Sequence, residues 1–331
     1  MILYEYPLNE RTRTYLRLQH LFARFNQLSQ RSEALDHHYA LTTIFEIMEV
    51  ASRSELKSEI LKDIERHKHQ LNGYRGNPSI SEQALDLVIA QLDQRFESLN
   101  SMIGKMGSAL SESEFLNSIR SRTAIPGGTC EFDLPAYHAW QHHAPADRQA
   151  NLFDWSQHFA PLAKAIQLIL KMMRESGSTQ KVMATGGQLQ QNLPQGRNFQ
   201  LLRLRIDESL NLTPEISCNR LLVVIRLMQQ QADGKLLANK EDTPFEMTLC
   251  SQSADPFEPG EITMSEPSAK PKHVKCPTCG GPSLFSSQNA YRPFCSARCK
   301  GIDLGAWANE SFRVPEDTPP DQDNFGDPKL Q

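Results

Sequence analysis

Four cysteines near the C-terminal end constrain the fold of this chain more than any other feature. Cys276 and Cys279 are separated by two residues, Cys295 and Cys299 by three, and fifteen residues lie between the two pairs. A two-residue gap lets two thiolates bind one ion from a tight knuckle, and the second pair fits the start of a helix. Four sulfur ligands complete a tetrahedron and leave no position for water. The pattern predicts one structural Zn²⁺ ion and favours it over an iron–sulfur cluster.

The residues around these cysteines are those that a small metal-centred domain needs. Gly280 and Gly281 follow the first pair and suit a turned backbone, while Ser296 is a candidate helix cap. The candidate core residues around the metal are Phe285, Phe294, Leu304 and Trp307. So short a segment cannot bury enough apolar surface by itself, so the ion must supply much of the folding free energy. We therefore expect a four-cysteine zinc domain over residues 273–314.

The first part of the chain has the apolar spacing of helices. Apolar residues recur at three- and four-residue steps in five runs, which span residues 15–28, 41–48, 56–71, 85–103 and 155–173. Ser79 or Ser81 is a candidate cap for the fourth run. Polar and charged residues occupy the opposite faces. This pattern predicts a helical domain over residues 1–180, built as a bundle with solvated outer faces.

The spacing then changes to two, which is typical of a sheet with one buried face. Leu202, Leu204 and Ile206 alternate with arginines, and two later segments, at 220–228 and 245–249, repeat the alternation. We expect an antiparallel β-domain over residues 181–250, and hence an α+β fold. The expected wet face carries Arg203, Arg205, Arg220 and Arg226. These side chains are either an ordinary solvated surface or a site for an acidic peptide, which Arg53 could extend.

Charge separates the remaining segments. Residues 1–250 carry 27 basic and 28 acidic groups, whereas residues 270–313 carry seven basic and two acidic ones. Residues 251–272 have the Ser, Pro, Glu and Lys content of a flexible linker, and residues 315–331 that of a disordered acidic tail. A basic zinc domain leaves open a nucleic-acid-binding protein as the alternative function. The near-neutral body argues against that alternative.

An enzyme is the other alternative, and the sequence gives it little support. His138, His142 and Cys130 are the residues on which such a reading would depend. No HExxH pattern or phosphate-binding loop accompanies them, and no paired carboxylates do. No apolar run approaches the length of a membrane span, and no secretory signal is visible at the start. We expect a cytoplasmic protein that binds partners and is not an enzyme.

Residues 1–250 resemble the ZapD family of cell-division factors. The resemblance is carried by the string YPLNERTRTYLR at 6–17, by IPGGTCEFDLP at 125–135 with His138 and Trp140, and by PEIS at 214–217. The family implies a dimer with a helical and a β-domain that crosslinks FtsZ filaments through the acidic, partly apolar FtsZ tail. It implies an FtsZ-binding role for Arg53, Arg203, Arg205, Arg220 and Arg226. Leu222 departs from the family pattern, which leads us to expect a basic residue there.

Residues 274–313 resemble the YacG family, whose members are small zinc proteins that inhibit DNA gyrase by binding its GyrB subunit. The matching strings are CPTCG at 276–280 and RPFCSARCKGIDLGAWA at 292–308. By this resemblance, Arg292, Arg298 and Trp307 are candidates for the gyrase contact. The whole chain is therefore similar to a fusion of the two families. It implies a cytoplasmic protein at the division septum with FtsZ and GyrB as partners, and no direct contact with membrane or nucleic acid.

Overall fold

The computed structural model describes residues 1–78, 80–102, 104–194, 196–219, 221–252, 272–285, 289, 291–292 and 294–300. The chain divides into two compact units, Met1–Pro259 and Gly260–Gln331. The first contains a helical lobe and two sheets, and the second contains the four cysteines. This arrangement confirms the predicted α+β class with a separate zinc-binding module.

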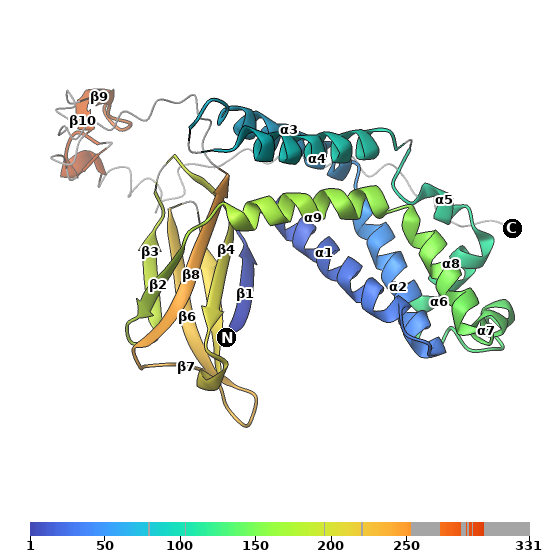
Figure 1. The fold of residues 1–331 in the computed structure, drawn as a ribbon. Helices are drawn as coiled ribbons and strands as arrows, with labels where there is room; N and C mark the ends of the chain where they lie inside the picture. The colour runs from blue at the N-terminus through green and yellow to red at the C-terminus, as the bar shows by residue number, and fades with distance from the viewer. Residues whose placement is uncertain are drawn as a thin grey trace, which may run out of the picture. The chain divides into compact units, whose positions relative to one another are not determined.

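The helices of the first unit gather in one lobe (Figure 1). In chain order they are α1 (Glu10–Ser29), α2 (Ala34–Ala51), α3 (Leu56–Asn72), α4 (Glu82–Asn100), α5 (Ser108–Ser111), α6 (Glu114–Thr123), α7 (Pro135–Gln141), α8 (Pro145–Gln157) and α9 (Ala160–Glu175). Helix α9 runs from this lobe to the sheets and contacts α1, α3 and α4 as well as two strands. Within the described residues, none of the helices combines the length and apolar composition that a bilayer span requires.

Side-chain caps fix where several helices begin. The Asn9 side chain accepts a hydrogen bond from the backbone of Thr12 at the start of α1. Ser81 caps α4 in the same way, which decides between the two serines that the sequence offered; Ser79 lies outside the described residues. A capping side chain satisfies one of the backbone N–H groups that the first helical turn leaves unpaired. Local sequence therefore sets these boundaries.

The interior of the helical lobe is apolar with a few buried polar groups. Tyr15, Leu18 and Ile44 are completely buried and belong to one continuous core. The carboxylate of Asp63 on α3 lies inside this lobe, where it accepts hydrogen bonds from Tyr15 Oη at 2.9 Å and from Arg11 at 2.5 Å, both on α1. A third bond comes from Arg66, so the buried charge has cationic partners and α1 is tied to α3.

Two antiparallel sheets lie beside the helices. The strands are β1 (Ile2–Pro7), β2 (Thr179–Ala184), β3 (Gln188–Asn192), β4 (Asn198–Ile206), β5 (Leu212–Cys218), β6 (Leu222–Gln230), β7 (Leu236–Ala238) and β8 (Thr243–Gln252), with the 3-10 helix η1 (Glu208–Leu210) between β4 and β5. Sheet A has the order β1-β4-β8-β2, and sheet B has the order β3-β6-β5 with β7 also paired to β6. Sheet A therefore includes a strand from the very start of the chain, which the sequence analysis did not anticipate.

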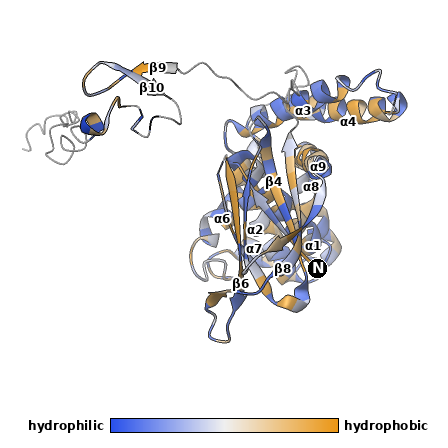
Figure 2. Cartoon of the chain, turned by 90° about the vertical axis from the view of Figure 1, so that its left-hand side faces the viewer, coloured by the Kyte–Doolittle hydropathy of each residue, from blue (hydrophilic) through white to orange (hydrophobic). Residues whose placement is uncertain are grey.

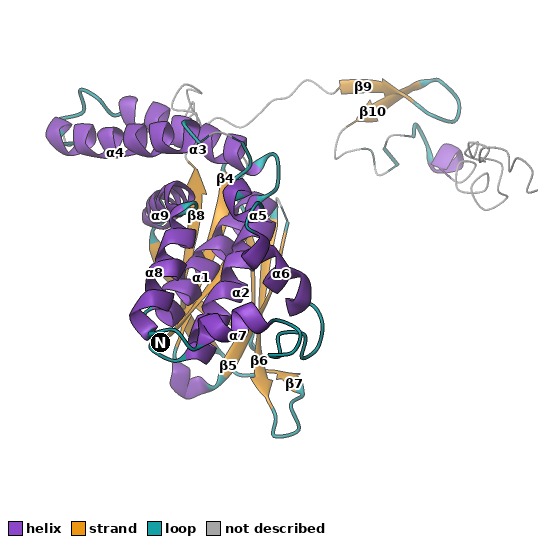
Figure 3. Cartoon of the chain, turned by 90° about the vertical axis from the view of Figure 1, so that its right-hand side faces the viewer, coloured by secondary structure: helices purple, strands orange, loops and turns teal. Residues whose placement is uncertain are grey.

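The two sheets pack face to face as a sandwich. Leu202 and Leu204 of sheet A and Val223 and Ile225 of sheet B meet in one buried cluster. This confirms the period-two pattern, and the apolar residues on these strands appear in orange in Figure 2. The other face of sheet A lies against the helices, because Leu201 of β4 belongs to the core of the helical lobe. Figure 3 shows the helices as a layer over the strands on that side.

Candidate functional site

The four cysteine sulfurs of the second unit lie together. All four Sγ atoms are within 4.8 Å of one another. Cys295 Sγ lies 3.5 Å from that of Cys279 and 3.6 Å from that of Cys299. Soft thiolates at tetrahedral spacing are the donor set that zinc selects in structural sites. The four cysteines, Cys276, Cys279, Cys295 and Cys299, therefore hold one structural Zn²⁺ ion, as the spacing predicted.

Backbone geometry explains why the two cysteine pairs converge. Strands β9 (Lys272–Lys275) and β10 (Pro282–Phe285) form a hairpin, and Gly280 closes its knuckle at a φ of +71°. Only a residue without a side chain adopts this conformation at little cost. On the other side, Ser296 Oγ accepts a hydrogen bond from the backbone of Cys299, which confirms the predicted cap. Thr278 Oγ1 donates to the Cys299 carbonyl at 3.0 Å and links the pairs.

Other predicted features of this module are only partly described. Arg292 and Arg298, the candidate gyrase contacts, are exposed. Trp307 lies outside the described residues, as does Leu304. The expected linker at 251–272 and the acidic tail at 315–331 lie almost wholly outside them too.

The expectation that the sheet arginines share one wet face is wrong. Arg203 and Arg205 are on β4 in sheet A, whereas Arg226 is on β6 in sheet B, so they lie on the outer faces of opposite sheets. Arg220 lies outside the described residues. The alternation of apolar residues identifies the buried face of each strand, but it does not tell which strands pair. Two strands can therefore have the same pattern and turn their polar sides in opposite directions.

Arg203 is engaged in a network inside the protein. Its Nε donates to Glu5 of β1 at 2.9 Å, and Arg174 of α9 binds both oxygens of the same carboxylate, at 2.8 and 2.7 Å. Burial alone would raise the pKa of Glu5, but the hydrogen bonds and charges of the two arginines more than offset it, so that pKa is lowered. Arg203 therefore holds β1 and α9 against β4, and little of its side chain is accessible to a binding partner.

The remaining predicted arginines are accessible but separate. Arg226 is exposed beside Leu222 and Val224 on the outer face of sheet B, with Glu215 at 3.9 Å. Arg205 is exposed at the far end of β4. Arg53 is exposed in the loop between α2 and α3, in a hollow that it shares with Glu10, Glu55 and Glu59. Among the described residues, no single surface unites Arg53, Arg203, Arg205 and Arg226.

Two histidines of α2, His37 and His38, take part in structural contacts. His37 is completely buried; its Nδ1 accepts a hydrogen bond from Arg148 at 2.9 Å, and its Nε2 lies 2.6 Å from the Arg31 carbonyl. Burial, and then the charge of Arg148, lower the pKa of His37 and keep the ring neutral. His38 bonds the hydroxyl of Tyr137 in the same region. These rings join the helices to one another.

The residues of the enzyme alternative do not form a recognisable site. The rings of His138 on α7 and His142 directly after it are 4.5 Å apart, and His142 Nδ1 bonds the His138 carbonyl. Among the described residues, only the four zinc cysteines form a group of three or more side chains that could hold a metal ion. Cys130 lies half-buried in the loop before α7. Nothing in this geometry assigns these residues a catalytic role.

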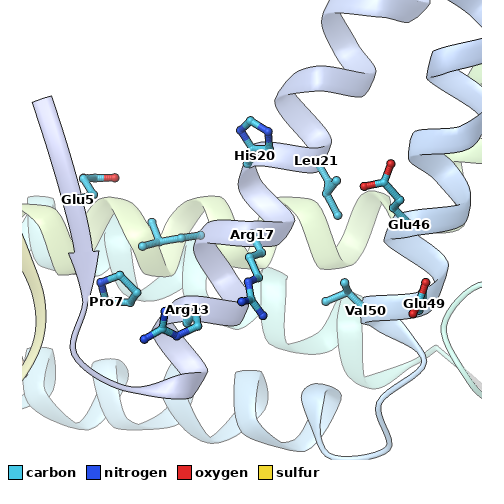
Figure 4. Close-up of a pocket in the computed structure, with 10 residues that line it drawn as sticks. Glu5, Pro7, Arg13, Arg17, His20, Leu21, Glu46, Glu49 and Val50 are labelled. Atoms are coloured by element: carbon cyan, nitrogen blue, oxygen red, sulfur yellow. The ribbon is translucent and has the colours of Figure 1, made fainter. Parts of the chain in front are cut away.

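The structure adds a groove that the sequence analysis missed. It has a volume of about 540 Å³ and lies between β1, α1 and α2 (Figure 4). Its apolar lining is Pro7, Leu16, Leu21 and Val50, and its polar and charged lining is Glu5, Arg13, Arg17, His20, Glu46 and Glu49. Two of the three acidic side chains are already paired, Glu5 with the arginines described above and Glu46 with Arg24.

The basic side of this groove comes from one helix. Arg13, Arg17 and His20 follow one another on α1 at steps of four and three residues, so they share a face. Arg17 is exposed and makes no ion pair with the described residues. The spacing was visible in the sequence, and Arg13 and Arg17 lie within the string that carries the ZapD resemblance. It went unnoticed because the same helix has a stronger apolar period on its other face.

Comparison with known proteins covers almost the whole chain. The family model described as ZapD, cell division protein, matches residues 16–226, and the one described as DNA gyrase inhibitor YacG matches residues 274–325. A cell division protein ZapD from Ralstonia pickettii is 47% identical over 252 residues, which is 76% of this chain and all of the relative. ZapD proteins from Ralstonia nicotianae and Cupriavidus pinatubonensis are 47% and 45% identical over the same length and with the same coverage.

These findings define the class of protein as a cell-division protein that carries a zinc-binding module. The body has the helices and antiparallel sheets predicted for it, and the module has the four cysteines that bind the metal. The chain belongs to the ZapD family, and a segment that matches the YacG family follows the body in the same chain.

Proposed function

We propose that this chain binds FtsZ filaments and crosslinks them as a homodimer, and so promotes assembly of the division septum in the cytoplasm. The ZapD family implies FtsZ as the partner, and the named relatives are cell division proteins. In this role the chain links filaments to one another and catalyses no reaction. The proposal draws its main support from the identity to ZapD proteins over the whole of their length.

The groove beside α1 is the site that we propose for the acidic, partly apolar FtsZ tail. Its lining supplies apolar contacts, and Arg17 is a cation without an ion pair among the described residues. The acidic residues of the groove should repel the acidic tail only weakly, because Glu5 and Glu46 already have arginine partners. Arginine suits carboxylates through charge-assisted hydrogen bonds. Arg53, Arg205 and Arg226 remain candidate contacts outside this groove, and Arg220 remains a candidate from the sequence.

Low-speed co-sedimentation of the full chain with FtsZ and GTP, over a salt series, tests the proposal. Bundles should pellet at low salt and less at high salt, because exposed charges are screened over a Debye length of about 10 Å at 0.1 M salt. Arg17→Glu should weaken binding of the FtsZ tail peptide about tenfold or more, since it replaces a charge-assisted bond by a repulsion. Lys171→Glu is the matched control: the side chain is 68% exposed on α9, outside the groove.

Each outcome of this comparison has a defined meaning. If Arg226→Glu weakens binding and Arg17→Glu does not, the tail binds on sheet B and the groove is not its site. If no variant differs from Lys171→Glu and no bundles pellet at any salt, the crosslinking role is wrong. Crosslinking also requires two tail sites in one particle, whose second contact is effectively intramolecular. Analytical ultracentrifugation should therefore find a dimer, and a strict monomer that still bundles filaments would contradict this part.

We further propose that the zinc module binds the GyrB subunit and limits DNA gyrase, as the YacG match implies. Arg292, Arg298 and Trp307 are the candidate contacts. In a gyrase supercoiling assay, Arg298→Glu should reduce inhibition while Lys171→Glu retains it. A gel shift with DNA and without gyrase separates the alternative function: tight, salt-sensitive DNA binding would favour a nucleic-acid-binding protein over a gyrase inhibitor.

A further inference from the structure

The zinc centre is asymmetric in its exposure to solvent. Cys276 is only 1% exposed and Cys299 is 9% exposed, whereas Cys279 and Cys295 are exposed. The exposed sulfurs come from opposite sides of the site, one from the knuckle after β9 and one from the turn before the helical residues 297–300, and they lie 3.5 Å apart. The metal centre therefore has a buried pair and an accessible pair.

We propose that Cys279 and Cys295 form an oxidation site, at which a peroxide converts the two thiolates to a disulfide and the module releases its zinc. Susceptibility of cysteine to oxidation follows thiolate character and accessibility. Zinc ligation keeps all four sulfurs as thiolates, so accessibility distinguishes them. The buried sulfurs of Cys276 and Cys299 are shielded from the oxidant by the same packing that holds the module together.

The reaction balances with hydrogen peroxide as the only oxidant. The Sγ thiolate of one exposed cysteine attacks a peroxide oxygen, the O–O bond breaks, and a sulfenic acid and hydroxide form. The second thiolate attacks the sulfenic sulfur, the S–S bond forms, and hydroxide leaves. Two protons from solvent convert both hydroxides to water. Two thiolates are thus oxidised, one peroxide is reduced, and the site loses two of its four ligands.

Local geometry favours this pair of cysteines for the disulfide. Their sulfurs need to approach by about 1.5 Å to reach the S–S bond length of about 2.05 Å. The Cys295 and Cys299 sulfurs are nearly as close, but Cys299 is buried and its carbonyl is bound by Thr278. Loss of two ligands removes the ion that supplies much of the folding free energy of the module. The body is spared, since its cysteines, Cys130, Cys218 and Cys250, belong to the other compact unit.

The test uses the full-length zinc protein, hydrogen peroxide and a chromogenic zinc dye. After quenching, free thiols are alkylated with light N-ethylmaleimide, disulfides are reduced, and the new thiols are alkylated with the heavy form. Trypsin separates Cys299 from the others, because cleavage after Lys275, Arg298 and Lys300 yields peptides 276–298 and 299–300. We expect one zinc per chain to be released for each disulfide formed. The heavy label should be on Cys279 and Cys295 and the light label on Cys276 and Cys299.

Two outcomes would overturn the inference: a heavy label on Cys299 or Cys276 in place of the exposed pair, or oxidation of body cysteines while zinc stays bound. A variant with Cys130→Ser, Cys218→Ser and Cys250→Ala removes the other thiols and should release zinc at the unchanged rate. Cys295→His keeps a ligand without the sulfur and should slow release; release at the wild-type rate would contradict the proposal. If that variant does not bind zinc, the wild-type peptide map still decides. None of these readouts depends on FtsZ or gyrase binding.

Discussion

The helical lobe and the zinc module are stabilised by different kinds of interaction. The lobe distributes its stability over a continuous apolar core, in which each fully buried side chain contributes about 1.5–3 kcal/mol. The module depends on four sulfur atoms within 4.8 Å of one another. Loss of one contact in the lobe is therefore partial, whereas loss of one ligand in the module should be close to complete. The two parts also differ in how readily they are oxidised. The module exposes two of the sulfur atoms on which its fold depends, whereas the residues on which the lobe depends are buried.

The largest expected effect is in the module. Cys295→Ser should release zinc and unfold residues 274–313, because metal binding in structural sites is worth about 10–16 kcal/mol. The first 250 residues should stay folded, since they form a separate unit. Zinc content and the dispersion of amide NMR signals measure both effects. Cys130→Ser is the control and should keep the zinc. If residues 274–313 of the Cys295 variant still gave dispersed amide signals, the module would be folded without its fourth ligand, and its stability would not depend on the metal site.

The next effect is in the lobe. Asp63→Ala should lower the free energy of unfolding by about 3 kcal/mol, because it leaves Arg11, Arg66 and the Tyr15 hydroxyl without their buried acceptor. Urea unfolding monitored by circular dichroism measures the change. The matched control is Asp93→Ala, whose carboxylate is 46% exposed and pairs with Lys68, and which should cost less than about 1 kcal/mol. Equal costs would mean that burial does not distinguish the two ion pairs.

A smaller effect depends on pH. The folded pKa of Glu5 is below its usual value of 4.5, so its contribution is present above pH 4.5 and is lost as pH falls through the folded pKa. Glu5→Gln should cost about 2 kcal/mol at pH 7, and the difference from wild type should shrink on acidification. Unfolding curves from pH 7 to pH 3 measure it. A difference that stays constant over this range would show that the carboxylate charge is not what holds β1 to α9.

The smallest expected effect is a gain in the free energy of unfolding. His67 of α3 is 6% exposed, and its Nε2 has no hydrogen-bond partner within the part of the chain that the structure describes. Burial lowers its pKa, so the wild-type protein loses stability as pH falls below the usual value of 6.5. His67→Leu should raise the free energy of unfolding by about 1 kcal/mol at pH 7 and by more at pH 6. His20→Leu on exposed α1 surface should give no gain. A loss in the His67 variant would reveal a contact for this ring.

Much of the fold could be predicted from periodicity. The three- and four-residue steps identified the long helices, and the alternation around Leu202, Val223 and Phe245 identified buried strand faces. Two features could not be predicted in this way. The strand Ile2–Pro7 lacks the alternation of apolar and polar residues, because Ile2, Leu3 and Tyr4 follow one another, and its partner is at Leu201–Ile206. The division of the strands into two sheets depends on which strands pair, and that is set by contacts between distant segments.

The candidate sites differ in the same respect. The zinc ligands could be predicted because all four lie within one short stretch whose spacing suits the ion. The groove beside α1 could not, since it combines Pro7 of β1, Arg17 of α1 and Glu49 of α2. Nor could the sequence reveal that Arg203 is bound to Glu5, which is 198 residues away in the chain. Charge patterns identify exposed cations only where no distant partner neutralises them.

The N-terminal strand has a consequence for how the protein is made. Ile2 pairs with Ile206 and Pro7 with Leu201, so this strand leaves the ribosome long before its partner and stays unpaired until most of the body has been synthesised. During that time Tyr4 and Tyr6, which pack into the sandwich core, lack the core that covers them. The helices have mainly local contacts and can form meanwhile. Closure of sheet A is therefore a late, long-range step, and chaperones have the most to contribute before β4 arrives.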